Sequence, residues 1–218
     1  MNLQPESFEE YRKYAYIFMS KTATPEKIAS FEEILVKQYN NYVLDTEDQN
    51  YFEPKIQDTD DHSLTKYKNQ RYKDFGFDEI KENQFYFLIT PSFEADNMLV
   101  VEKLEENYLL KHIILEEKPL VATLDKSFGD EIFRILDKIV SQARKKKSNM
   151  FGLDGTGHTL LCMIGGERKM FYKWSPNENS TSGKVIALLQ HLITIIKSPA
   201  QEKLTELALK IEEFRLND

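Results

Sequence analysis

Apolar and aromatic side chains recur at helical spacing along the first part of the chain. Two such stripes are visible, one on each side of Thr24-Pro25, which offers a helix cap followed by a first-turn proline. Their members are Phe8, Tyr11, Ala15 and Phe18 before this dipeptide, and Ile28, Phe31, Leu35 and Tyr42 after it. The spacing predicts an N-terminal helical hairpin over residues 1–45.

The pattern then changes to short apolar runs bounded by turn residues, which is typical of strands. Five runs are predicted to be strands: residues 85–90, 98–103, 108–115, 158–164 and 169–174. A short polar turn separates the second run from the third, and Gly165-Gly166 separates the fourth from the fifth, so two hairpins are expected. Both faces of the third run are largely apolar, which indicates a sheet covered on both sides.

Helical periodicity returns in the C-terminal half. Residues 127–147 carry a broad apolar stripe and end in four bases that complement the helix dipole. Residues 182–197 are apolar nearly all round and are predicted to be buried, and a last helix is expected to start at Ser198-Pro199. The predicted fold is therefore α+β, with a mainly antiparallel sheet of about five strands covered by helices. A parallel crossover between residues 115 and 158 remains an alternative.

Composition divides the chain into three parts. Residues 1–45 form the predicted hairpin, residues 46–84 are an acidic and then basic connecting segment, and residues 85–218 are the α+β main domain. The chain has 218 residues, of which 41% are hydrophobic, so it is long enough to bury one sizeable core. One continuous globular unit is expected.

A dense acidic stretch follows the predicted hairpin. It contains one base, Lys55, and seven acids, and it holds −6 of the formal net charge of −7. The acids are Asp45, Glu47, Asp48, Glu53, Asp58, Asp60 and Asp61. One hypothesis makes this stretch a docking surface for a basic protein partner. The alternative is a solvated loop that the bases between Lys66 and Lys73 partly neutralise.

The overall charge and hydropathy narrow the classes of partner. A net negative charge disfavours broad binding to nucleic acid or to anionic membranes, because both would be repelled. Tyr67 and Tyr72 lie among bases and could stack on nucleobases, but the neighbouring acids make that surface unfavourable. The sequence shows no secretory signal and no apolar stretch long enough to cross a bilayer, so a cytoplasmic location is expected.

The residue types used in catalysis and metal binding follow no recognisable motif. The glycine-rich residues 152–157 lack the lysine and the following helix of a phosphate-binding loop. Cys162 lies in an apolar run, which predicts a buried thiol rather than a nucleophile. The four histidines lack the spacing of metal ligands: His62, His112, His158 and His191. No catalytic residue, cofactor site or metal ligand is therefore assigned.

Several short motifs resemble a known group of proteins. Residues 152–156 (GLDGT), a hairpin, Trp174-Ser175-Pro176 and an apolar helix resemble the C-terminal half of small bacterial α+β proteins with an LDGT…WSP pattern. Residues 90–93 (TPSF) look like the companion element of that pattern. Some of these proteins are grouped with immunity proteins that neutralise antibacterial toxins of contact-dependent or type VI systems. The resemblance covers roughly residues 85–197 and implies a non-enzymatic binding protein, with no catalytic residues to carry over.

The leading hypothesis is therefore an immunity protein that blocks a toxin domain by surface complementarity. The acidic stretch from Asp45 to Asp61 is its first candidate contact region. Two alternatives remain. An enzyme, such as a hydrolase or a nucleotide-modifying protein, predicts a concave polar pocket with converging titratable groups, and a regulatory adaptor predicts a partner that is not toxic when it is expressed alone.

Overall fold

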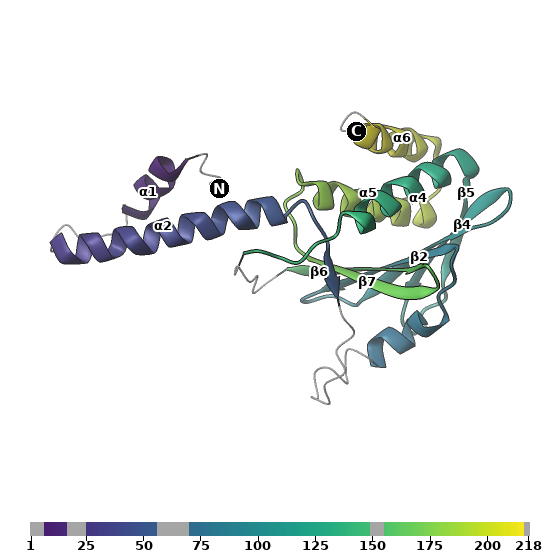
Figure 1. The fold of residues 1–218 in the computed structure, drawn as a ribbon. Coiled ribbons are helices and arrows are strands. Elements are labelled where there is room, and N and C mark those ends of the chain that lie inside the picture. Colours follow the sequence, from purple (N-terminus) through teal and green to yellow (C-terminus); the bar gives the residue numbers. More distant parts are fainter. Residues whose placement is uncertain (1–6, 17–24, 56–69, 149–154, 216–218) are drawn as a thin grey trace. The chain divides into compact units, whose positions relative to one another are not determined.

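The computed structural model describes residues 7–16, 25–55, 70–148 and 155–215 (Figure 1). The chain splits into two compact units. The first comprises Met1–Asp48 and Lys146–Phe151, and the second comprises Gln49–Lys145 and Gly152–Asp218. Each unit is described by itself below.

The first unit contains two helices, α1 (Phe8–Tyr16) and α2 (Pro25–Asp48). Tyr39 of α2 contacts the rings of Phe8 and Tyr11 on α1, with ring centroids 5.4 and 5.5 Å apart. An ion pair between Arg12 and Glu32 links the same two helices. The predicted contact between two aromatic helices is confirmed for these residues, whereas the connection, residues 17–24, lies outside the described residues.

The second unit is built on an antiparallel sheet of seven strands in the order β1-β7-β6-β2-β3-β4-β5. The strands are β1 (Glu53–Lys55), β2 (Gln84–Pro91), β3 (Asn97–Lys103), β4 (Asn107–Ile114), β5 (Leu120–Asp125), β6 (Thr156–Ile164) and β7 (Glu167–Trp174). The α+β class is confirmed. Strand β2 pairs with β6 in antiparallel orientation, so the chain returns to the sheet without a parallel crossover.

The prediction of about five strands is wrong in number, because β1 and β5 were missed. These two strands form the two edges of the sheet. Strand β1 has three residues and contains Pro54, and β5 buries only Leu124 among its six side chains. An edge strand with so few buried side chains has no apolar alternation for sequence analysis to detect.

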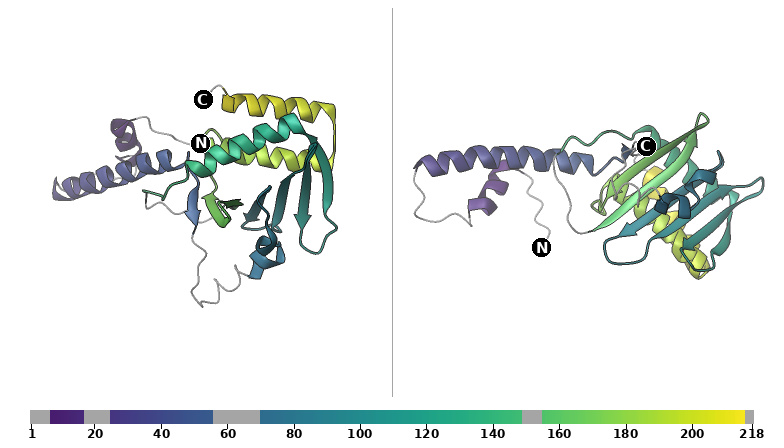
Figure 2. Two further views of the ribbon diagram at one scale, coloured as in Figure 1. Left: turned by 45° about the vertical axis from the view of Figure 1, so that its right-hand side comes forward. Right: turned by 90° about the horizontal axis from the view of Figure 1, so that it is seen from below.

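Helices α4 (Lys126–Ser141) and α5 (Thr181–Lys197) cover one face of the sheet, and α6 (Gln201–Arg215) packs on these two helices (Figures 1 and 2). Their apolar side chains pack with alternate residues of the strands, such as Phe87 of β2 and Leu160 of β6, in the main core. Helix α5 is buried along most of its length, as its sequence predicts. Among the described residues, no helix has both the length and the apolar composition that a membrane crossing requires.

Helix α4 ends at Ser141, six residues before its predicted end at Lys147. The Ser141 hydroxyl donates to the carbonyl of Lys138 at 2.7 Å, and the backbone N–H of Arg144 donates to the carbonyl of Phe52 at 3.0 Å. The backbone N–H of Arg144 is therefore bonded outside the helix. The four bases from Arg144 to Lys147 do not occupy the last helical turn, and the predicted dipole role is wrong.

The opposite face of the sheet carries a second, smaller core. Tyr86 and Leu88 of β2 point to this face and pack with Phe75 and Phe77 from residues 70–80. The ring of Tyr72 stacks on Phe77 with centroids 4.9 Å apart. The sheet is thus covered in part on both sides, and Tyr72 is held beside the strands.

Candidate functional site

The segments that carry the resemblance meet at one corner of the sheet. In the strand register Pro91 of β2 lies opposite Thr156 of β6, and Gly157 lies opposite Trp174 of β7. The Ser92 hydroxyl donates to the carbonyl of Gly155 at 2.7 Å. Segments more than sixty residues apart in the chain are therefore joined directly at this corner.

A serine closes the other side of the corner. The Ser175 backbone N–H donates to the carbonyl of Thr156 at 2.9 Å, and the Thr156 N–H donates to the Ser175 hydroxyl at 2.7 Å. Gly155 has a φ of 152°, and a Cβ atom there would lie 2.1 Å from the Ser175 Oγ. Glycine is required for this approach. The other residues of the glycine-rich stretch that precede it, 152–154, lie outside the described residues.

A pocket of about 400 Å³ lies beside this corner, and we call it the aromatic pocket. Tyr172 and Trp174 alternate along β7, so both rings project from the same face of the sheet. Leu88 of β2 also lines it and belongs to the core on the face opposite the helices. The remaining lining includes Thr90, Thr159, Tyr72, Arg71, Lys55 and Glu53.

A lysine ammonium group lies among the tyrosine rings. Lys55 Nζ donates a hydrogen bond to the Tyr72 hydroxyl at 2.9 Å and lies 4.9 Å from the centroid of Tyr172. Burial, and then the neighbouring Tyr72 and Glu53, raise the pKa of Tyr172 to about 12. Tyr172 therefore stays a neutral hydroxyl near pH 7, able both to donate and to accept hydrogen bonds.

Trp174 carries a hydrogen-bond donor that no described residue accepts. Its Nε1 atom is buried and has no hydrogen-bond partner in the described part of the chain. A buried donor without an acceptor costs about 1–3 kcal/mol.

A buried ion pair holds the segment that supplies Tyr72. Arg71 pairs with Asp96, whose side chain is only 3% exposed. Burial raises the pKa of Asp96, and the Arg71 guanidinium lowers it in part. The pair ties residues 71–72 to the turn before β3 and so fixes one wall of the aromatic pocket.

Comparisons of the chain with protein-family models, with curated proteins and with solved structures found no match.

Three of the seven acids predicted as a contact region lie at the end of α2 in the first unit. The Asp48 carboxylate is buried and accepts the backbone N–H groups of Lys147 and Ser148 at 2.9 and 2.8 Å. Asp45 accepts the Ser148 hydroxyl at 3.0 Å, and Glu47 pairs with Lys147 at 3.6 Å. These three acids lie in a helix and contact Lys147 and Ser148, so they are not part of a solvated loop.

Of the other four predicted acids, one lies among the described residues. Glu53 lies on β1 in the second unit and lines the aromatic pocket. Asp58, Asp60 and Asp61 lie outside the described residues. The structure therefore describes four of the seven predicted contact residues, three in the first unit and one in the second, and the contact region stays a prediction.

The thiol and the imidazole that stood out in the sequence are buried in the sheet. Cys162 is buried as predicted, and burial, together with Asp137, raises its pKa to about 12, so the thiol stays protonated. His158 stacks on Phe87, and burial lowers its pKa to about 4. Among the described residues, no three His, Cys, Asp or Glu side chains lie together as metal ligands would.

Sequence analysis missed the aromatic pocket as a unit. Tyr172 and Trp174 carry the one local signal, because residues two apart on a strand share a face. Lys55 was counted only as a base in an acidic stretch, and Tyr72 only as an aromatic residue among bases. Their convergence depends on the pairing of β1 with β7, which no local pattern indicates.

Proposed function

We propose that this protein is a non-enzymatic binding protein, and specifically an immunity protein that neutralises a bacterial toxin by surface complementarity. The aromatic pocket is the proposed contact that receives a side chain of the toxin. The observation that carries the proposal is the position of this pocket beside the corner built from Ser92, Gly155 and Ser175, the segments of the resemblance.

The composition of the aromatic pocket supports this role. Trp, Tyr and Arg are the residues most enriched among the energetic hot spots of protein interfaces, and Tyr72, Tyr172, Trp174 and Arg71 line one cavity here. The two rings on β7 are held by strand pairing, and the Tyr72 ring is held by its stacking on Phe77. Little side-chain entropy is therefore lost on binding.

The state of the buried titratable groups supports a binding role over a nucleophilic one. A protonated Cys162 thiol does not attack a substrate near pH 7, and its side chain is 2% exposed. His158, with a pKa of about 4, is neutral at that pH and lies beneath the sheet surface against Phe87. These two groups serve the core.

The proposal is tested by finding a partner and measuring its toxicity. The tagged chain is used to recover bound proteins from the native organism, and the recovered partner is then expressed alone under an inducible promoter. We expect growth arrest, and we expect co-expression of the wild-type chain to restore growth. Trp174→Ala should protect poorly, while Leu209→Ala, an exposed apolar change on α6, should protect fully.

Three results would contradict parts of this proposal. A partner that is harmless when expressed alone favours the regulatory adaptor. Full protection by Trp174→Ala removes the aromatic pocket from the interface. Charge reversal of Asp58, Asp60 and Asp61 in the same assay tests the acidic stretch, and loss of protection in that variant alone would make it the contact region instead.

A further inference from the structure

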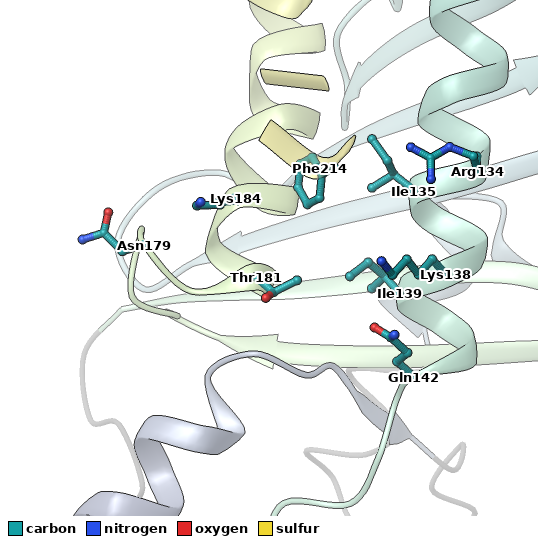
Figure 3. Close-up of a pocket in the computed structure, with 9 residues that line it drawn as sticks. All are labelled: Arg134, Ile135, Lys138, Ile139, Gln142, Asn179, Thr181, Lys184 and Phe214. Atoms are coloured by element: carbon teal, nitrogen blue, oxygen red, sulfur yellow. The ribbon is translucent and has the colours of Figure 1, made fainter. Parts of the chain in front are cut away.

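A second pocket, of about 330 Å³, lies within the helical layer of the second unit (Figure 3). Helix α4 supplies Arg134 and Lys138, which are four residues apart and therefore share one helix face. Lys184 comes from the first turns of α5, and Phe214 comes from the end of α6. We call this site the cationic pocket.

The lining of the cationic pocket is unusual in its charge. Three of its nine lining residues are positively charged and none is acidic, although the chain as a whole carries −7. The side chains that line the pocket therefore carry charge opposite in sign to the net charge of the protein. Such a concentration of one sign in a concave site attracts a ligand of the other sign.

Acids near the pocket form ion pairs with Arg134 and Lys184. Arg134 Nε lies 3.0 Å from Glu131, which also pairs with Arg215 at 2.9 Å. Lys184 Nζ lies 3.7 Å from Glu213, whose side chain is 55% exposed. Ion pairs at this level of exposure are worth about 1 kcal/mol or less. An incoming anion can therefore displace or share them at low cost.

The wall between the cations is apolar. Ile135 and Ile139 of α4 are almost fully buried, and the ring of Phe214 lies near them in the close-up view (Figure 3). Gln142 and Thr181 add neutral polar groups at the end of the pocket nearest the start of α5. Ligand sites commonly combine an apolar wall with a few polar groups that fix orientation.

From this arrangement we infer that the cationic pocket binds a small organic oxyanion, a phosphate or carboxylate attached to an apolar or aromatic group. The basic side chains of the lining supply the contacts to the oxyanion, and the apolar part packs on Ile135, Ile139 and Phe214. This site is separate from the aromatic pocket, which lies on the opposite face of the sheet. It does not depend on the proposed immunity function.

Calorimetric titration of the full chain at low salt tests the inference. Phenyl phosphate is the first probe, and inorganic phosphate and phenol represent its two halves. We expect saturable binding of phenyl phosphate, with each half binding more weakly. Benzoate replaces the phosphate by a carboxylate and shows which oxyanion the site prefers.

Matched variants connect binding to the pocket. The double variant Lys138→Gln/Lys184→Gln should weaken phenyl phosphate binding about tenfold, because it removes two charged hydrogen-bond donors. The control Lys118→Gln/Lys197→Gln removes the same charge at two exposed positions outside the pocket and should bind as the wild type does. Thermal unfolding of all variants checks that each is folded.

Three outcomes would overturn the inference. The first is the absence of saturable binding with both phenyl phosphate and benzoate. The second is an equal loss in both double variants, which would assign the effect to net charge. The third is equal affinity for inorganic phosphate and phenyl phosphate, which would leave the apolar wall without a role.

Discussion

The two pockets of the second unit are lined by different kinds of side chain. In the aromatic pocket, the rings of Tyr72 and Tyr172 lie against Lys55, which already donates a hydrogen bond to the Tyr72 hydroxyl. In the cationic pocket, long side chains of α4 and α5 surround a wall of aliphatic residues and Phe214. The first is preorganised by strand pairing and ring contacts, and the second keeps its charges on flexible side chains. We therefore expect the aromatic pocket to bind through close ring contacts, and the cationic pocket to bind through electrostatic attraction of an anion.

The pockets also depend on different parts of the fold. The aromatic pocket needs the pairing of β1 with β7 and the attachment of residues 71–72 by the pair Arg71–Asp96. The cationic pocket needs only the packing of three helices over the sheet. A change that damages one should therefore leave the other intact, and the predictions below use this independence.

The largest effect is expected from Arg71→Ala. This change leaves the Asp96 carboxylate buried without its cation, which should lower the free energy of unfolding by about 3 kcal/mol at pH 7. Thermal and denaturant unfolding measure the loss. Phenyl phosphate binding at the cationic pocket should not change in the folded variant.

The same variant has a predicted pH dependence. Burial already raises the pKa of Asp96 above its ordinary 3.8, and removal of Arg71 should raise it further. The unfolded chain then ionises at lower pH than the folded one, so stability falls as pH rises through the folded pKa and recovers toward pH 4. In Arg71→Ala/Asp96→Asn this dependence should disappear. If it persisted, Asp96 would not be its source.

A second prediction concerns the affinity for the protein partner. Trp174→Ala should weaken partner binding about thirtyfold, as expected for a central interface anchor. Trp174→Phe keeps an aromatic ring but removes the N–H, and it should weaken binding about fivefold. The affinities of both variants are measured on immobilised partner protein, with the wild-type chain as the reference. Identical affinities for the two variants would mean that the N–H meets no acceptor.

Sequence analysis identified the central strands of the sheet but missed its two edge strands. The α+β class and the antiparallel pairing followed from five strand-like runs, because central strands such as β2 bury nearly every side chain. The edge strands β1 and β5 bury too little to leave a pattern. The local sequence pattern reflects how many side chains of a strand are buried, and this pattern is weakest in the edge strands of a sheet.

The acidic stretch shows a second limit. Its charge was evident, but Asp48 accepts the backbone N–H of Ser148, 100 positions further along the chain. A helix that ends on such a contact looks like a charged loop when only neighbouring residues are considered. The bases at residues 146–147 were assigned to a helix terminus for the same reason, although Lys146 pairs with Asp45 at 3.6 Å.

A third prediction separates the two pockets by their response to salt. Raising sodium chloride from about 50 mM to about 500 mM shortens the screening length severalfold and should weaken phenyl phosphate binding about fivefold. Partner binding through the aromatic pocket should change by less than about twofold. Equal salt sensitivity at both sites would show that charge, rather than ring contact, dominates both.

The smallest effect is the late titration of Tyr172. Its pKa of about 12 in the folded chain exceeds the ordinary 10.0, because burial disfavours the phenolate. Its contribution to stability is thus complete below pH 10 and is lost between pH 10 and 12, where the unfolded chain ionises first. Tyr172→Phe should make the decline of stability over this range less steep. Tyr108, also with a pKa of about 12, remains as an internal reference that keeps part of the decline. An unchanged slope in Tyr172→Phe would mean that this ring is open to solvent, and the aromatic pocket would then lose its claim to be preorganised.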